Sequence, residues 1–393
     1  MGVEAKEHYR KLSPFLSNLT QFLRVLLVIL GGLYVMDIHL YLGLAISSQQ
    51  FLGLVLALGL AIIFLSIPIK KSHPLEYLPW YDIIMAVMGA ACGLYVFFWY
   101  PKIANTLFFV SADKYLLSTV AIVLIFEATR RLYGPVLVCI AAGFIFYASF
   151  AKYFPGILKT ASIPWTDLST NLYLGNNGTF GYPMEVIATI VLAFIIFGAL
   201  MFAAGGGSLF TDIASAAMGR FRGGPAKIAV LGSCFFGSIS GAALANVAVT
   251  GTFTIPLMKR LGYRPEMAAA VEATASVGGI VTPPIMGSVA FIMADFLEIP
   301  YYKIVIAAII PALLYYGAIL IQVDLEAARS KMKGLPADEI PKLGAILRPN
   351  WPYLIPLAVI LFTLMVLYWR PAKAGMAACI TTVIVILLRV KGQ

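Results

Sequence analysis

Two consecutive apolar stretches of the sequence contain small polar residues of the kinds that bind ions. The first includes GSISGAALAN, from Gly237 to Asn246, and the second includes GGIVTPP, from Gly278 to Pro284. Their hydroxyl, amide and carbonyl oxygens are hard ligands without fixed charge, and such oxygens suit a small monovalent cation. The candidate ion- and substrate-binding residues are Ser238, Ser240, Asn246, Thr274, Ser276, Gly278, Gly279 and Thr282.

Two unusual elements must position these residues. The apolar stretch 228–258 has 31 residues, and one upright spanning helix needs only about 20. We therefore predict two short helices that meet at GSISGAALAN, as in a re-entrant hairpin. In the stretch 266–297, paired glycines and paired prolines remove backbone hydrogen bonds in the middle of the segment. This pattern predicts a discontinuous helix.

A helix that is broken at membrane depth has a chemical consequence. Lipid cannot hydrogen-bond the loosened backbone groups, so they must be paired inside the protein or bind a ligand. Secondary transporters use such helices to hold coupling ions, and their positive helix ends suit an anionic substrate. Each motif alone also has a plainer interpretation, because Gly237 and Gly241 have the spacing of close helix packing and a Pro-Pro kink is usually structural. Their occurrence in consecutive segments favours a binding site.

The composition places these elements in a membrane. Hydrophobic residues make up 61% of the 393 residues and charged residues only 12%, whereas a soluble domain is about a quarter charged. The sequence thus predicts an all-α polytopic membrane protein with about nine spanning helices, and it excludes a cytosolic enzyme or a nucleic-acid binder. The predicted spans are 22–44, 51–68, 82–100, 115–130, 134–153, 185–204, 303–323, 352–369 and 374–389.

The net charge of +10 is explained by membrane topology. If the N-terminus is cytoplasmic and 228–258 enters and leaves on that side, 21 of the 28 Lys and Arg residues lie on the cytoplasmic face. The positive-inside rule expects such a bias. A true crossing at 228–258 would move the basic stretches 259–264 and 329–348 to the other face, so the count also supports the hairpin. Residues 154–184 then form a polar external loop, and 324–350 form an amphipathic cytoplasmic arm.

The remaining ionisable residues do not indicate an enzyme. Glu127 and Asp295 lie near predicted span ends and are interpreted as interfacial, whereas Glu272 is either a cap-region acid or part of a cytoplasmic gate. All three histidines lie in the first fifth of the chain, far from the polar motifs, and neither an HExxH motif nor a phosphate-binding loop is present. We predict no catalytic residues and no cofactor.

The run from Gly219 to Lys331 closely resembles the large permease of tripartite ATP-independent periplasmic (TRAP) transporters. The resemblance rests on GRFRGGPAKIAVLGSCFFGSISGAALANVAVTGTFTIPLMKRLGY and AAAVEATASVGGIVTPPIMGSVAFIMADFLEIP. Four predicted spans precede Arg130 and Arg131, which is similar to the branch in which the small subunit is fused to the permease. The implied domains are a small-subunit-like scaffold at 1–132 and the N-terminal part of the large permease at 133–393.

The resemblance implies import of an organic acid, such as a dicarboxylate, by sodium symport and an elevator mechanism. The implied partners are an extracytoplasmic substrate-binding protein and the lipid bilayer of a bacterial or archaeal inner membrane. In this scheme GSISGAALAN is the tip of the first hairpin, and GGIVTPP completes the first sodium site. The implied sodium ligands are Ser240, Gly278, Gly279 and Thr282.

The sequence also departs from the resembling permeases. Ala242 stands where the family commonly has a serine, and Ile280 where it often has a polar residue, which puts the ligand count or the substrate in question. The family fold has inverted repeats, but only the first repeat is recognisable, so we expect a missing C-terminal permease half. Two alternatives stay open: an ion-coupled carrier that works without a binding protein, and a non-transporting membrane scaffold or assembly subunit.

Overall fold

The computed structural model describes residues 10, 12–69, 78–106, 111–175 and 178–390. These residues form helices joined by short connections, and no β-strand occurs among them. The chain divides into two compact units, residues 1–188 and 189–393. The domain boundary predicted at 132/133 stays a prediction.

The first unit contains a pair of closely packed apolar helices, α4 (Ser48–Ser66) and α5 (Trp80–Ala104). They approach so closely at Gly93 that a β-carbon there would lie 2.4 Å from the carbonyl oxygen of Gly53. Buried apolar side chains of both helices, including Phe64 and Val96, form the core. The other helices of the unit are α2 (Pro14–Val35), α3 (Ile38–Tyr41), α6 (Ala112–Tyr133), α7 (Pro135–Phe150), α8 (Trp165–Leu174) and α9 (Tyr182–Val186).

A buried group of charges joins α5 and α6. Asp82 forms ion pairs with Arg131, at 2.7 Å, and with Arg10, and all three side chains are at most 2% exposed. Arg131 also pairs with Glu127 at 2.9 Å, which places that acid beside its own helix end. These contacts tie the chain segment before α2 to two later helices of the same unit.

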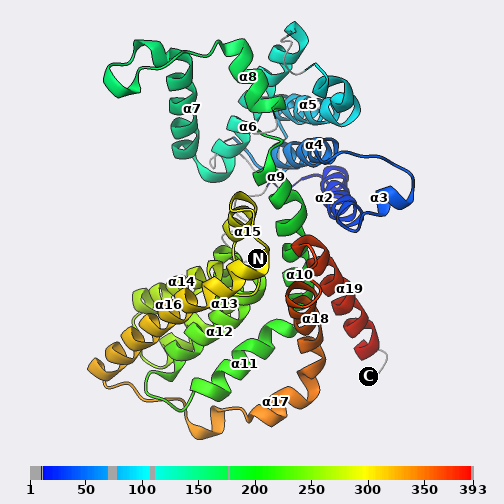
Figure 1. The fold of residues 1–393 in the computed structure, drawn as a ribbon. Helices are drawn as coiled ribbons and strands as arrows, with labels where there is room; N and C mark the ends of the chain where they lie inside the picture. The colour runs from blue at the N-terminus through cyan, green and yellow to red at the C-terminus, as the bar shows by residue number, and fades with distance from the viewer. Residues whose placement is uncertain (1–9, 11, 70–77, 107–110, 176–177, 391–393) are drawn as a thin grey trace. The chain divides into compact units, whose positions relative to one another are not determined.

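The second unit contains the predicted hairpin and the predicted broken helix side by side (Figure 1). The hairpin consists of α12 (Gly224–Ser240) and α13 (Ala243–Arg260), which confirms two short helices that meet at a tip. The broken helix starts as α14 (Pro265–Val277), continues through the 3-10 turn η4 (Gly278–Ile280) and resumes as α15 (Ser288–Phe296). The long helix α16 (Tyr301–Arg329) packs against α12 and α14.

The remaining elements of the second unit precede and follow this group. They are α10 (Leu192–Ala203), α11 (Gly206–Met218), η5 (Ala337–Glu339), α17 (Leu343–Asn350), η6 (Trp351–Tyr353), α18 (Leu354–Met365) and α19 (Pro371–Val390). Helix α19 packs against both α10 and α18, and α11 packs along α12. The predicted amphipathic arm, residues 324–350, thus contains the end of α16, the 3-10 turn η5, the helix α17 and the connections between them.

Eight helical segments of the described chain are long and apolar enough to cross a membrane. The predicted span 115–130 is not one of them. It lies in the 22-residue helix α6, which also carries Asp113 and Lys114 in its first turn and Arg130 and Arg131 in its last. These charges lower the mean hydropathy of a helix that is nevertheless long enough to span.

Two predicted boundaries differ from the structure. The first helix, α2, ends at Val35 rather than near residue 44, because Asp37 adopts a left-handed conformation with φ of 57° and interrupts the helix. The predicted loop 154–184 contains α8, whose residues Tyr173 and Leu174 are buried. The surrounding Gly, Pro and Asn residues indicated a loop, but the ten residues of α8 between them form a helix.

Candidate functional site

The hairpin tip is a tight turn between α12 and α13. Gly241 ends α12 in the left-handed conformation, with φ of 59°, and its N–H donates to the carbonyl of Gly237 at 2.9 Å. Ala242 is extended, and α13 begins at Ala243. Glycine adopts the left-handed conformation without the steric penalty of a side chain, which explains why the sequence breaks the hairpin here.

The broken helix hydrogen-bonds both itself and the hairpin. The N–H of Gly287 donates to the carbonyl of Ile280 at 2.7 Å, which closes the non-helical turn. The N–H of Ile285 donates to the carbonyl of Ser238, in the last turn of α12, at 3.3 Å. The loosened backbone is therefore paired inside the protein, as a break at membrane depth requires.

The two glycine motifs meet directly. A β-carbon on Gly237 would lie 2.6 Å from the Cα of Gly279 and 3.1 Å from Nδ2 of Asn246. Side chains larger than hydrogen would separate the hairpin from the broken helix at this point. Close helix packing, one of the two interpretations that the sequence leaves open, therefore occurs at this point, and the binding site stays a prediction.

Four helix ends surround one cavity of about 310 Å³. Its lining includes the C-terminal residues of α12 and η4, Ser240 and Ile280, and the N-terminal residues of α13 and α15, Ala243 and Ser288. The first N–H groups and last carbonyls of helices lack partners within the helix, and they carry partial positive and negative charges, respectively. The cavity therefore offers dipole ends of both signs within one small volume.

Of the four predicted sodium ligands, Ser240 is the one in the lining of this cavity. Gly278, Gly279 and Thr282 are buried in the break of the second segment. The hydroxyl of Thr282 donates to the carbonyl of Gly278 at 2.6 Å, so these two oxygens adjoin each other. Ser238 is turned back on its own helix, where its hydroxyl donates to the carbonyl of Phe235 at 2.7 Å.

Asn246, Ser276 and Thr274 lie in different surroundings. Asn246 is fully buried, and its Nδ2 donates to the carbonyl of Ser233 at 2.8 Å. Ser276 is also fully buried, but its hydroxyl donates to Glu272 at 3.1 Å rather than facing the tip cavity. Thr274 is exposed, and its carbonyl accepts from the hydroxyl of Tyr315. The side chain of Thr274 thus lies apart from the buried candidates, although its carbonyl also accepts from the N–H of Gly278.

Glu272 is the central residue of a buried polar cluster. Its carboxylate accepts from the hydroxyls of Ser233, Thr250, Thr254 and Ser276. Glu272 is fully buried and lies beyond the first turn of α14, so it is not a cap residue, and a role in a cytoplasmic gate stays a prediction. The sequence contained a signal for this cluster, since Thr250 and Thr254, like Glu272 and Ser276, are four residues apart and share one helix face.

Three tyrosines of α16 hold the broken helix, and the sequence did not reveal them. Tyr315 and Tyr316 donate to the carbonyls of Thr274 and Ala275 at 2.7 and 3.1 Å, where α14 ends. Tyr301 donates to the carbonyls of Pro284, at 2.9 Å, and Ile285. The hydroxyls thereby bind carbonyls on both sides of the break, and the carbonyl of Thr274 also keeps its helical bond from the N–H of Gly278.

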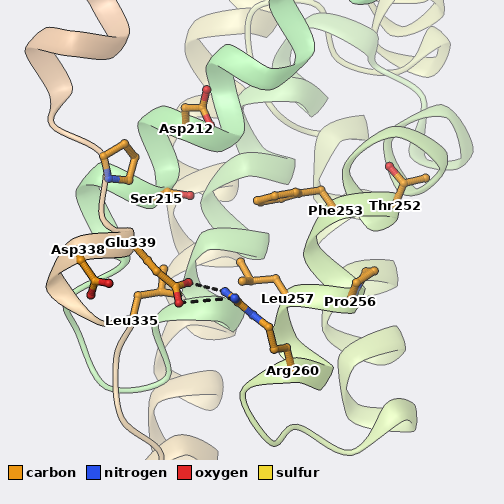
Figure 2. Close-up of a pocket in the computed structure, with 11 residues that line it drawn as sticks. Asp212, Ser215, Thr252, Phe253, Pro256, Leu257, Arg260, Leu335, Asp338 and Glu339 are labelled. Atoms are coloured by element: carbon orange, nitrogen blue, oxygen red, sulfur yellow. Dashed lines mark hydrogen bonds and ion pairs between the residues drawn. The ribbon is translucent and has the colours of Figure 1, made fainter.

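An open groove of about 780 Å³ lies at the other end of α13 (Figure 2). Phe253 and Leu257 provide apolar lining, Arg260 forms an ion pair with Glu339, and Asp338 lies beside them. Burial raises the pKa of Asp212, on α11. The groove is thus more acidic than the tip cavity, which makes it the poorer candidate for an anionic substrate.

Comparison with known proteins places the chain among transport proteins. Residues 120–393 match the family model of the tripartite ATP-independent periplasmic transporter, DctM component. The chain is 29% identical over 195 residues to the C4-dicarboxylate TRAP transporter large permease protein DctM of Pseudomonas aeruginosa. The aligned region covers 49% of this chain and 45% of that protein.

Two further relatives have other named substrates. The isethionate TRAP transporter permease protein DctMQ of Oleidesulfovibrio alaskensis is 31% identical over 170 residues, or 42% of this chain and 26% of that protein. The 2,3-diketo-L-gulonate TRAP transporter large permease protein YiaN of Escherichia coli is 27% identical over 154 residues, or 39% of this chain and 35% of that protein.

The extent of these matches supports one assignment. The chain spans between about a quarter and about half of the length of these curated relatives. The family match covers more than half of the chain, and eight described helices are long and apolar enough to span a membrane. The chain is therefore a multi-pass membrane protein that belongs to the DctM permease family of tripartite ATP-independent periplasmic transporters.

Proposed function

We propose that this chain is part of the permease of a sodium-coupled importer of an organic acid in the inner membrane. In this proposal a binding protein outside the membrane delivers the substrate, and the hairpin and broken helix carry it across by an elevator movement. The N-terminus is cytoplasmic, residues 1–132 act as a fused small subunit, and a second permease half completes the substrate site.

The convergence of four helix ends on the tip cavity supports this proposal most strongly. Carbonyls at the C-terminal ends of α12 and η4 suit a cation, whereas the N-terminal ends of α13 and α15 suit a carboxylate. Ser240, Thr282 and the carbonyls of Gly278 and Gly279 are the proposed sodium ligands. Because both ions are held by one pair of segments, binding of the cation favours binding of the anion beside it.

The choice of an organic acid is also supported by the relatives. The substrates for which three of them are named, a C4-dicarboxylate, isethionate and 2,3-diketo-L-gulonate, are all organic anions. The acidic groove at the far end of α13 would repel such a substrate, so we propose the tip cavity as the substrate site.

The experiment that tests the proposal is uptake of a radiolabelled C4-dicarboxylate into proteoliposomes. The complete transporter containing this chain is reconstituted with its binding protein and given an inward sodium gradient, with potassium as the control ion. We expect uptake that requires both sodium and the binding protein. Uptake that persists without the binding protein would favour a carrier that works alone, and absence of both uptake and ion binding would favour a scaffold.

A further inference from the structure

Glu272 has a carboxyl group that the proposed function has not used. Its carboxylate is fully buried among the legs of the hairpin and the first half of the broken helix. Ser233 comes from α12, Thr250 and Thr254 come from α13, and Ser276 comes from α14, so one carboxylate joins three helices. Substitution of this residue would release hydrogen bonds in all three.

The charge of this carboxylate has no cationic neighbour in the described part of the chain. No Lys, Arg or His side chain among the described residues forms an ion pair with it. Burial of a carboxylate is expensive unless hydrogen bonds and an opposite charge compensate it. The hydroxyls supply the hydrogen bonds, and a bound cation would supply the opposite charge.

Thr250 connects the carboxylate to Asn246, a candidate site residue. The Thr250 hydroxyl lies 3.2 Å from Oδ1 of Asn246 and also hydrogen-bonds Oε1 of Glu272. A hydroxyl has only one proton to donate, so Thr250 cannot donate to both oxygens at once. When Thr250 donates to Glu272, Oδ1 of Asn246 is left as an acceptor that can bind a cation.

The other end of Asn246 is held firmly. Its Nδ2 donates to the carbonyl of Ser233, and it lies beside the contact between Gly237 and Gly279. The amide therefore has a single orientation, with Oδ1 toward Thr250. The Thr250 hydroxyl also lies 2.9 Å from the backbone carbonyl of Asn246, so Glu272 is one of two acceptors that compete with Oδ1 for its proton.

We propose that Glu272 is a positioning residue for the cation site of the hairpin. Its carboxylate accepts the hydrogen bond of Thr250, which leaves Oδ1 of Asn246 available, and gives a site with otherwise neutral ligands the negative charge that attracts a monovalent cation. The inference rests on the proposed function, since it specifies what makes the cation bind. Glu272 belongs to the buried polar cluster below the hairpin tip, and it does not touch the cation itself.

The test is a sodium titration of thermal stability with the purified complete transporter in detergent. The variant Glu272→Gln keeps the size of the side chain, but it removes the charge and replaces one of the two acceptor oxygens by an NH2 donor. We expect it to raise the sodium concentration for half-maximal stabilisation by about tenfold or more. The matched control is Glu266→Gln, an exposed acid on the same helix, and it should stay within about twofold of the wild type.

A second pair of variants separates orientation from charge and covers a misfolded Glu272→Gln. Thr250→Ser keeps the hydroxyl and should titrate like the wild type. Thr250→Val removes the proton that competes for Oδ1 of Asn246 but retains the carboxylate of Glu272, so it should not raise the half-saturating sodium concentration. The proposal would be overturned if Glu272→Gln lowered the melting temperature without sodium but left the half-saturating sodium concentration unchanged. That result would mean that Glu272 has only a structural role.

The wild-type result distinguishes the two proposals. If sodium, lithium and potassium all fail to stabilise the wild type, the role of Glu272 is overturned, because there is no cation for it to attract. Sodium-driven uptake by the wild type together with unchanged titration of Glu272→Gln would overturn only the role of Glu272. Wild-type stabilisation by sodium that Glu272→Gln weakens, without any carboxylate uptake, would support Glu272 and count against the proposed transport function.

Discussion

The carbonyl oxygen of Met286 lies 1.9 Å from the position that a β-carbon on Gly241 would occupy. The hairpin tip therefore touches the non-helical turn of the broken helix through backbone alone. Gly241 also has a positive φ, so two independent features require glycine there. This contact joins the two segments that surround the tip cavity.

The first prediction concerns that glycine. Gly241→Ala would force the tip and the turn apart, and we expect it to abolish carboxylate uptake while the protein still inserts into the membrane. The matched control is Gly262→Ala, which also has a positive φ, of 96°, but has no atom within 4 Å of its β-carbon position. That variant should cost only the conformational strain of about 1 kcal/mol. Equal uptake by the two variants would contradict the proposed role of the hairpin tip in transport.

The second prediction concerns the proposed sodium ligand Thr282. Its hydroxyl adjoins the carbonyl of Gly278. Thr282→Val keeps the shape but removes the oxygen, and we expect the half-saturating sodium concentration for uptake to rise by about tenfold, which corresponds to about 1.4 kcal/mol. Thr282→Ser retains the oxygen and should behave nearly as the wild type. A Val variant with the sodium response of the wild type would remove Thr282 from the ligand set.

The third prediction concerns the support of the broken helix. Tyr301 donates its hydroxyl to Pro284 and Ile285 carbonyls while its ring stacks on Phe291. Tyr301→Phe keeps the ring but leaves buried carbonyls without this donor, so we expect a loss of about 1–3 kcal/mol, seen as a lower melting temperature in detergent. Tyr302→Phe is the control, since its hydroxyl makes no hydrogen bond to another described residue. A similar melting temperature for both variants would argue against stabilisation of the broken helix by the Tyr301 hydroxyl.

The fourth prediction concerns the buried charges of the first unit. Asp82→Asn leaves Arg10 and Arg131 without their buried carboxylate, and we expect a destabilisation of about 3–5 kcal/mol. Glu339→Gln removes a more exposed pair with Arg260 and should cost at most about 1 kcal/mol. The measurement is the thermal denaturation of each purified variant, compared with that of the wild type. Destabilisation in the reverse order would refute the structural importance of the buried group.

Local chemistry made the broken elements predictable from the sequence. Paired glycines and prolines remove or loosen helical hydrogen bonds wherever they lie, so the break near Gly278 follows from neighbouring residues alone. The break near Gly241 was predictable because the apolar stretch 228–258 is too long for one spanning helix and has small polar residues at its centre. The same holds for the long apolar runs, which predicted most of the spanning helices. Asp37 was harder to interpret, because a single left-handed residue that ends a helix has a weak sequence signal.

Contacts between distant residues could not be predicted in this way. Asp82 and Arg131 are 49 residues apart, and neither has a local pattern that indicates a buried ion pair. The tyrosines of α16 are equally ambiguous, since Tyr315 lies 41 residues from the carbonyl that its hydroxyl holds. Helical periodicity predicts which residues share a face, but it does not identify the helix that covers the face.

The sequence by itself determined the class of protein, the two breaks and the oxygen-rich residues around them, because composition and Gly/Pro chemistry act locally. Only the tertiary structure decided which of those oxygens meet. It separated Thr274 from the site, placed Ser276 on Glu272 and brought Gly237 against Gly279. The physical reason is that a binding site depends on the packing of several helices, and the hydrogen bond between Glu272 and Thr250, 22 residues apart, exists only after the hairpin has packed on the broken helix.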